Sequence, residues 1–275
     1  MSAPRSSSRE VRKAEASAST PATFTFDVGT HGTVSGGIFL SPDPIHTATL
    51  ILAHGAGAPR THPFMIDIAT RIASRGVDVV TFNFLYAEAG RKMPDRVELL
   101  EATWRAAIAT VRARRGFVHT ERIFIGGKSM GGRMATHIAA SATAEGLLID
   151  GVALLGYPLH PINKPRVVRE EIRAVKDIPI LVVQGTRDEL GTAAEMKKML
   201  ASMENANTRL HVVEDGDHSL VLPKALGAEA QERALEDAAA AVATFIASPS
   251  APPARRVKTS GKAKTTKGPA RPRRR

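Results

Sequence analysis

Hydrophobic and polar positions follow two different periods along residues 23–248. Short runs rich in Val, Ile and Leu recur, and between them apolar residues return every three or four positions, as in β-strands separated by α-helices. Eight runs are predicted to be strands: residues 24–28, 33–40, 48–53, 77–84, 123–126, 151–155, 178–184 and 209–214. Strands that alternate with helices need crossover connections, so the pattern predicts an α/β fold with a mostly parallel eight-stranded sheet flanked by helices. The Gly-containing turn at residues 29–32 predicts an antiparallel hairpin at one edge.

The clearest helical periodicity covers residues 97–115. One face of this segment carries Leu100, Trp104, Ile108 and Val111. The only tryptophan of the chain therefore lies on an apolar stripe, and we expect it to pack in the core rather than to bind a ligand. A second periodic segment, residues 228–247, gathers Ala and Val on one face and is expected to close the fold.

Composition excludes several kinds of protein. Hydrophobic residues make up 43% of the 275 residues and charged residues 24%, which is typical of a globular protein with a substantial core. The chain has no cysteine, which excludes disulfides, cysteine-ligated zinc, iron–sulfur clusters and a cysteine nucleophile. The longest nearly apolar stretch, residues 238–247, is far shorter than the ~20 residues of a membrane-spanning helix, so we expect no membrane insertion.

The net charge of +11 is concentrated at the two ends of the chain. Of the 38 Lys and Arg residues, ten lie in residues 251–275 without an acid, and four lie in the first twenty residues beside two Glu. Residues 21–250 keep 24 basic and 25 acidic residues, so this part is nearly neutral. Both ends are rich in Ser, Ala, Pro and Lys without apolar periodicity. We therefore expect disordered tails over residues 1–22 and 249–275 and one folded domain over residues 23–248.

The basic C-terminal tail predicts a partner that is recognised by charge alone. Ten cations without an acid favour salt-sensitive binding of nucleic acid or another polyanion by residues 251–275. A tail that only keeps the protein in solution is the alternative that the sequence leaves open. The first residues lack the apolar segment of a secretory signal, so we expect a cytoplasmic protein.

The strongest chemical signal lies in residues 123–135, which read as strand, sharp turn and helix. The turn contains G-x-S-x-G, with Gly127, Ser129 and Gly131. Small residues are needed on both sides of the serine because a Cβ there would collide with neighbouring backbone in so tight a turn. The pattern is typical of a nucleophile elbow, which presents a serine hydroxyl at the edge of a sheet.

Two phosphate-binding motifs fail at defined positions. Residues 127–129 resemble the end of a P-loop, but the glycine required five places earlier is Arg122. Residues 55–57 resemble the start of a dinucleotide-binding fingerprint, but the third glycine position is occupied by Arg60. We therefore expect neither a nucleotide nor a nicotinamide or flavin cofactor.

A serine hydroxyl needs a base to activate it and an acid to orient that base. Asp188 follows the apolar run at residues 178–184, with Glu189 as the nearest alternative acid. His218 lies in the loop after the last predicted strand, whereas His62 and His160, which also lie in loops, do not follow it. Order along the chain and position at strand ends both favour Ser129, Asp188 and His218 as a catalytic triad.

Carboxylates beside His218 raise the alternative of a metal site. Asp215 and Asp217 precede it, but a second histidine at metal-ligand spacing is missing from this segment. We therefore expect no metal.

The loop at residues 54–57 predicts half of an oxyanion hole. It follows the third predicted strand, and we expect the backbone N–H groups of Ala56 and Met130 to be the donors. A plain Gly-rich turn is the alternative, and His54 itself is expected to order the loop rather than to act in catalysis.

Several cations lie close in sequence to the predicted catalytic residues: Arg60, Lys128, Arg133 and Arg187. They motivate the hypothesis of a substrate that carries a carboxylate or phosphate, held by a basic rim. The alternative is that these side chains point to solvent.

With these residues in place, residues 23–248 resemble the α/β-hydrolase superfamily. More narrowly, they look like a small group related to dienelactone hydrolase that includes the hydrolase-like domains of testis-expressed protein thirty and of NSL chromatin-complex subunit three. The resemblance is carried by residues 54–57, 126–133, 156–161, 184–188 and 215–219. It implies the triad Ser129, Asp188 and His218 and no cofactor, but it does not supply a substrate.

The expected function is a cofactor-independent serine hydrolase. Only about twenty residues separate Leu155 from Ile178, where larger hydrolases insert a lid domain, so we expect no lid and an open pocket. An open pocket favours small esters, thioesters, lactones or related acyl groups over long-chain lipids. The alternative is a non-catalytic hydrolase-like scaffold that is tethered to nucleic acid by its basic tail.

Overall fold

The computed structural model describes residues 21–44, 47–114, 118–119, 121–164 and 166–248. Within these ranges, eight strands form one sheet in the order β1-β2-β4-β3-β5-β6-β7-β8. The strands are β1 Ala22–Asp27, β2 Thr33–Phe39, β3 Ala48–Ala53, β4 Asp78–Phe82, β5 Arg122–Lys128, β6 Gly151–Leu155, β7 Ile180–Gly185 and β8 Thr208–Val213. β2 is antiparallel to both β1 and β4, and all other neighbours are parallel. The predicted eight-stranded, mostly parallel sheet and its edge hairpin are confirmed.

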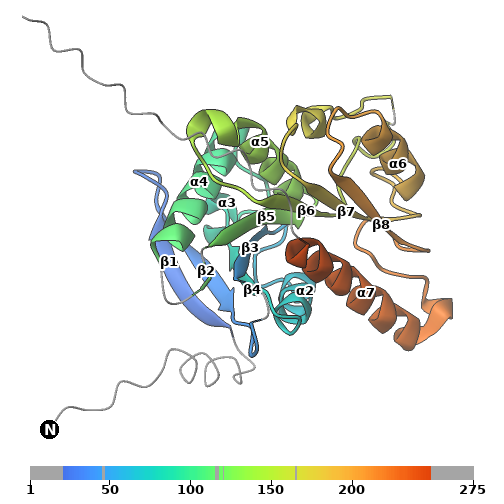
Figure 1. Ribbon diagram of the computed structural model, residues 1–275, viewed down its shortest axis with the longest axis horizontal. Helices are drawn as coiled ribbons and strands as arrows, with labels where there is room; N and C mark the ends of the chain where they lie inside the picture. Colours follow the sequence, from blue (N-terminus) through green and yellow to red (C-terminus); the bar gives the residue numbers. More distant parts are fainter. Residues whose placement is uncertain (1–20, 45–46, 115–117, 120, 165, 249–275) are drawn as a thin grey trace, which may run out of the picture.

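Helices cover both faces of the sheet (Figure 1). One face is covered by α2 Pro63–Ala73 and α7 Gly227–Ala247, whose buried residues form one core cluster with the sheet. The other face is covered by α4 Val97–Ala113, α5 Met130–Glu145 and α6 Ala193–Ala201, which share a second cluster. Shorter helices are α3 Leu85–Glu88, η1 Glu171–Ala174 and η2 Lys224–Leu226. The sheet is therefore the middle of three layers.

The predicted core residue Trp104 lies in the second cluster. Its side chain is fully buried, and its ring packs edge-on against Phe82 with the ring centroids 4.9 Å apart. The expectation that this tryptophan packs in the core is confirmed.

The predicted strand at residues 77–84 ends early, at Phe82. The Asn83 N–H still donates to Ser35 O on β2, but the Asn83 side chain donates to Glu88 on α3, and the Phe84 N–H donates to His54 Nε2. At Phe84 a side-chain bond therefore takes the place of the sheet pairing that β-propensity alone predicted.

The carboxyl ends of the parallel strands lie at the same edge of the sheet, so the loops that follow them meet there. The connection from β6 to β7 carries only η1 as a helix within the residues described, and no lid domain covers this edge. Across the described ranges, every helix is too short or too polar to cross a membrane.

Candidate active site

Ser129 lies at the sharp turn between β5 and α5. Its backbone has φ 51° and ψ −117°, a conformation that costs free energy for a residue with a Cβ. The turn is held by backbone bonds on both sides, because the Ser129 N–H donates to Leu155 O and the Arg133 N–H donates to Ser129 O. The structure therefore has the strained strand-to-helix turn that the G-x-S-x-G pattern predicts.

The glycines of this turn are required by close backbone contacts. A Cβ at Gly127 would lie 2.6 Å from the carbonyl carbon of Gly131, and a Cβ at Gly131 would lie 2.5 Å from His54 O. Backbone atoms cannot move aside as a flexible side chain can, so an alanine at either position would displace the turn or the loop after β3.

Three of the predicted site residues meet in one hydrogen-bonded chain. His218 Nε2 lies 2.8 Å from Ser129 Oγ, and His218 Nδ1 lies 2.9 Å from Asp188 Oδ2. Asp188 is 1% exposed, whereas the alternative acid Glu189 is exposed to solvent. A buried carboxylate on Nδ1 favours the tautomer that keeps Nε2 free to accept the serine proton.

The Asp188 carboxylate is held by a buried glutamine that sequence reasoning missed. Gln184 Nε2 donates to Asp188 Oδ2 at 2.9 Å, and the Leu190 N–H donates to Asp188 Oδ1 at 2.8 Å. The same glutamine also bonds to the backbone of Tyr157 and Gly191. A polar residue within the apolar run of β7 was the signal that could have identified it, since a buried amide needs partners.

The loop that carries His218 is bonded internally and to its neighbours. Asp217 Oδ1 accepts the N–H groups of Ser219 and Val221, and the Asp215 N–H donates to Thr186 Oγ1. The side chain of Asp217 therefore shapes the loop. Within the described part of the chain, no three His, Asp or Glu side chains are grouped so as to hold a metal ion.

His54 orders the loop after β3. Its Nδ1 lies 2.8 Å from Gly55 O, and its Nε2 accepts the Phe84 N–H at 3.1 Å, so the neutral ring donates at one nitrogen and accepts at the other. Burial lowers the pKa of His54 to about 4, although its bond to Gly55 acts in the opposite direction. Tyr86 Oη donates a further hydrogen bond to Gly55 O.

Arg60, Lys128 and Arg133, the cations predicted to form a substrate rim, each form a hydrogen bond or an ion pair within the protein. Arg60 is 9% exposed and donates from Nε to Ser35 Oγ at 3.2 Å, and the Arg133 guanidinium forms an ion pair with Glu171 at 2.9 Å. Lys128 is 8% exposed, and its Nζ donates to His218 O at 2.6 Å. Direct contact of these side chains with substrate stays a prediction.

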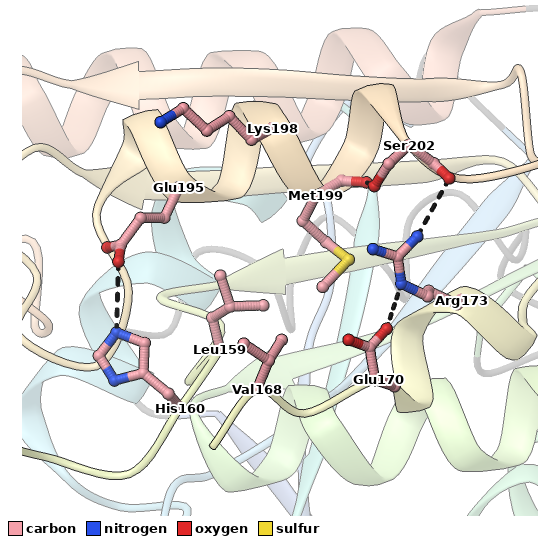
Figure 2. A pocket seen from close by; sticks show the side chains of 9 residues that line it. All are labelled: Leu159, His160, Val168, Glu170, Arg173, Glu195, Lys198, Met199 and Ser202. Carbon is pink, nitrogen blue, oxygen red and sulfur yellow. Dashed lines mark hydrogen bonds and ion pairs between the residues drawn. The ribbon is translucent and has the colours of Figure 1, made fainter. Parts of the chain in front are cut away.

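A separate hollow of about 280 Å³ lies between α6 and the connection from β6 to β7 (Figure 2). It is lined by Leu159, His160, Val168, Glu170, Arg173, Glu195, Lys198, Met199 and Ser202. Within it, His160 Nε2 faces Glu195 at 3.7 Å. The alternative base His160 therefore pairs with a carboxylate on α6, while His218 is the histidine that contacts Ser129.

Solved structures with a similar fold include several hydrolases. An α/β serine hydrolase without lid from Xanthomonas campestris is 20% identical, with 84% of this chain and 97% of that chain covered and a TM-score of 0.60. Dienelactone hydrolase from Anabaena variabilis is 19% identical over 78% and 96% of the two chains, with a TM-score of 0.58. An esterase from Pyrococcus furiosus is 18% identical over 78% and 90%, also with a TM-score of 0.58. At these identities the likeness establishes the fold alone.

A comparison of the sequence with models of protein families shows the family to which this chain belongs. The sequence model described as "Alpha/beta hydrolase domain" matches residues 46–247, which is more than half of the chain. The narrower resemblance to testis-expressed protein thirty and NSL-complex subunit three stays a prediction. Together with the sheet order and the turn at Ser129, the match establishes that this chain belongs to the α/β hydrolase domain family.

Proposed function

We propose that the protein is a serine hydrolase that cleaves a small ester, thioester, lactone or related acyl bond through Ser129, His218 and Asp188. The observation that carries this proposal is the chain of contacts Ser129 Oγ–His218 Nε2 at 2.8 Å and His218 Nδ1–Asp188 Oδ2 at 2.9 Å. Both distances lie within the range needed for proton transfer from a nucleophile to its base.

The reaction would run through an acyl-enzyme. Ser129 Oγ attacks the acyl carbon while its proton passes to His218 Nε2, and His218 returns that proton to the departing oxygen or sulfur. A water molecule, deprotonated by His218, then attacks the acyl-enzyme and releases the acid and Ser129. Asp188 stays ionised and holds the positive imidazole that forms in each step.

An oxyanion hole made by Ala56 and Met130 is supported by the direction of one peptide bond. Gly55 O accepts hydrogen bonds from His54 and Tyr86. Because the peptide is planar and trans, the Ala56 N–H points to the opposite side from these donors. Met130 is the first residue of α5, where backbone N–H groups lack partners within the helix and favour negative charge.

A small acyl substrate is supported by the short chain between β6 and β7. Its described residues contain only the 3-10 helix η1, and the similar structure from Xanthomonas campestris is described as a hydrolase without lid. A long acyl chain needs a covered apolar channel to leave water, and the short connection from β6 to β7 argues against such a cover.

The test is covalent labelling of the full chain by a fluorophosphonate, followed by intact-mass measurement. We expect one adduct per chain, and we expect Ser129→Ala and His218→Ala to abolish it. Ser74→Ala and His31→Ala, at exposed positions away from the site, serve as matched controls and should label like the unaltered chain. A folded native chain that remains unlabelled would refute the proposal.

The proposed contact with nucleic acid belongs to residues 251–275, which lie outside the described residues. We propose that this segment binds polyanions as an accessory to hydrolysis. Deletion of residues 251–275 should abolish salt-sensitive binding of duplex DNA and leave fluorophosphonate labelling unchanged. Retained DNA binding after the deletion would contradict this role.

A further inference from the structure

Lys128 places an ammonium group inside the protein, directly before Ser129. It is the last residue of β5, and its side chain is 8% exposed. A lysine is rarely so deeply buried unless its charge has partners, because removing an ammonium from water is costly. The partners of Lys128 therefore indicate what this residue does.

The ammonium group contacts the loop of His218, ninety residues further along the chain. Lys128 Nζ donates to the backbone oxygen of His218 at 2.6 Å. Gly156, with φ +60°, lies beside this bond: a Cβ there would be 2.5 Å from His218 O and 3.1 Å from Lys128 Nζ. The glycine thus leaves room for the ammonium group between the ends of β5 and β6 and the histidine loop.

The surrounding charges favour this position of the ammonium group. Asp188 and Asp217 both lie close enough to stabilise its charge, while burial acts more strongly against it, so the pKa of Lys128 is lowered to about 8. The group is therefore mostly charged at neutral pH and loses its proton in mildly alkaline solution. Asp188 is itself buried, and Lys128 is a cation that partly offsets its charge.

We propose that Lys128 is a positioning residue that fixes the His218 backbone through its ammonium group and so keeps His218 Nε2 at Ser129 Oγ. The inference rests on the proposed serine hydrolase function. It differs from the sequence-based expectation of a substrate rim, because it assigns the side chain to an internal bond that holds the base. A displacement of the imidazole by about 1 Å is enough to reduce catalysis about 100-fold.

The test compares Lys128→Met, which keeps the length of the side chain and removes its charge and donors, with the unaltered protein. We expect the rate of fluorophosphonate labelling and the kcat for para-nitrophenyl acetate to fall about 10- to 100-fold, with KM nearly unchanged. Lys128→Arg keeps a cationic donor and should restore part of the rate. Lys197→Met, at an exposed position on α6, is the matched control and should have no effect.

The same variants separate positioning from substrate contact. A rim contact would raise the KM for the anionic ester para-nitrophenyl hemisuccinate and leave hydrolysis of the neutral acetate unchanged, and that result would overturn the proposal. Equal labelling of Lys128→Met and the unaltered protein would also overturn it. Failure of the unaltered, folded protein to label would instead refute the proposed hydrolase function.

If Lys128→Met does not fold, the pH dependence of labelling of the unaltered protein tests the proposal instead. Its labelling rate should fall above about pH 8, as the Lys128 ammonium group loses its charge and its bond to His218 O weakens. A rate that stays constant from about pH 8 to about pH 10 would overturn the assignment of this role to the charged ammonium group, because an ordinary lysine, with a pKa of ≈ 10.4, stays largely charged over most of that range.

Discussion

Protonation of His54 is expected to destabilise the protein in mildly acidic solution. The ring is fully buried, and its Nε2 accepts the Phe84 N–H. A proton on Nε2 would remove this acceptor, leave the Phe84 N–H without it and place a positive charge in the interior. Burial accordingly lowers the pKa of His54 to about 4 from 6.5.

The direction and size of the effect follow from linkage. Between pH 6.5 and pH 4 the unfolded chain binds a proton at His54 that the folded chain does not, so the free energy of unfolding falls as pH falls through this window. Below pH 4 both states bind the proton and the loss is complete. At 1.36 kcal/mol for each pKa unit, the loss between pH 7 and pH 5 is about 2 kcal/mol.

Urea unfolding at pH 7 and pH 5 measures this loss. With an m-value of ~3 kcal/mol/M, about 2 kcal/mol lowers the midpoint by about 0.7 M. Carboxylates also titrate near this range, so His54→Gln is the matched comparison: its amide oxygen can accept the Phe84 N–H but does not titrate. The reasoning is refuted if both proteins lose the same stability between the two pH values.

Three substitutions test other parts of the structure. Asp188→Asn should reduce the kcat for ester hydrolysis about 10³- to 10⁴-fold because the wrong tautomer of His218 is held, and an unchanged kcat would remove Asp188 from the triad. Gly131→Ala should lower the free energy of unfolding by about 1–3 kcal/mol in urea, since the new Cβ meets His54 O; a neutral effect would mean that the backbone shifts freely. Glu236→Gln, which loses partly exposed ion pairs with Arg71 and Arg75 at the surface, should cost about 1 kcal/mol, and a much larger loss would contradict the weakness of surface pairs.

Periodicity was sufficient to predict the centre of the sheet because β3, β4, β6 and β7 are buried at every position and read as nearly continuous apolar runs. The run at residues 151–155 is apolar throughout, and β6 occupies those residues. Periodicity failed where side chains compete for the backbone. Phe84 has the local pattern of a strand continuation, but its N–H donates to His54 Nε2, and no property of residues 77–84 alone encodes a partner outside the segment.

The sequence was also sufficient to predict that Ser129, Asp188 and His218 belong to one site. In this fold the serine turn comes first along the chain, the acid at a strand end follows, and the histidine comes last. It could not predict which charged neighbours turn inward. Lys128 was a candidate for a substrate rim because it is next to Ser129 in the sequence, and a side chain that points to solvent was the alternative. Its burial depends on Gly156 and on the His218 loop, which are distant in sequence and meet only in the folded chain.

Buried ionisable groups at the carboxyl edge of the sheet share one structural role. His54 follows β3, Lys128 ends β5 and Asp188 follows β7, and each bonds to backbone of a loop: His54 to the Phe84 N–H, Lys128 to His218 O and Asp188 to the Leu190 N–H. Apolar side chains of similar volume would fill the same space, and replacing a whole buried ion pair in this way is often neutral or stabilising, whereas removing one partner is destabilising. They would not fix the loops, because dispersion contacts are not directional. The geometry around Ser129 therefore depends on these directional bonds, and Lys128→Met should lose the alignment of His218 even in the fraction of the protein that folds.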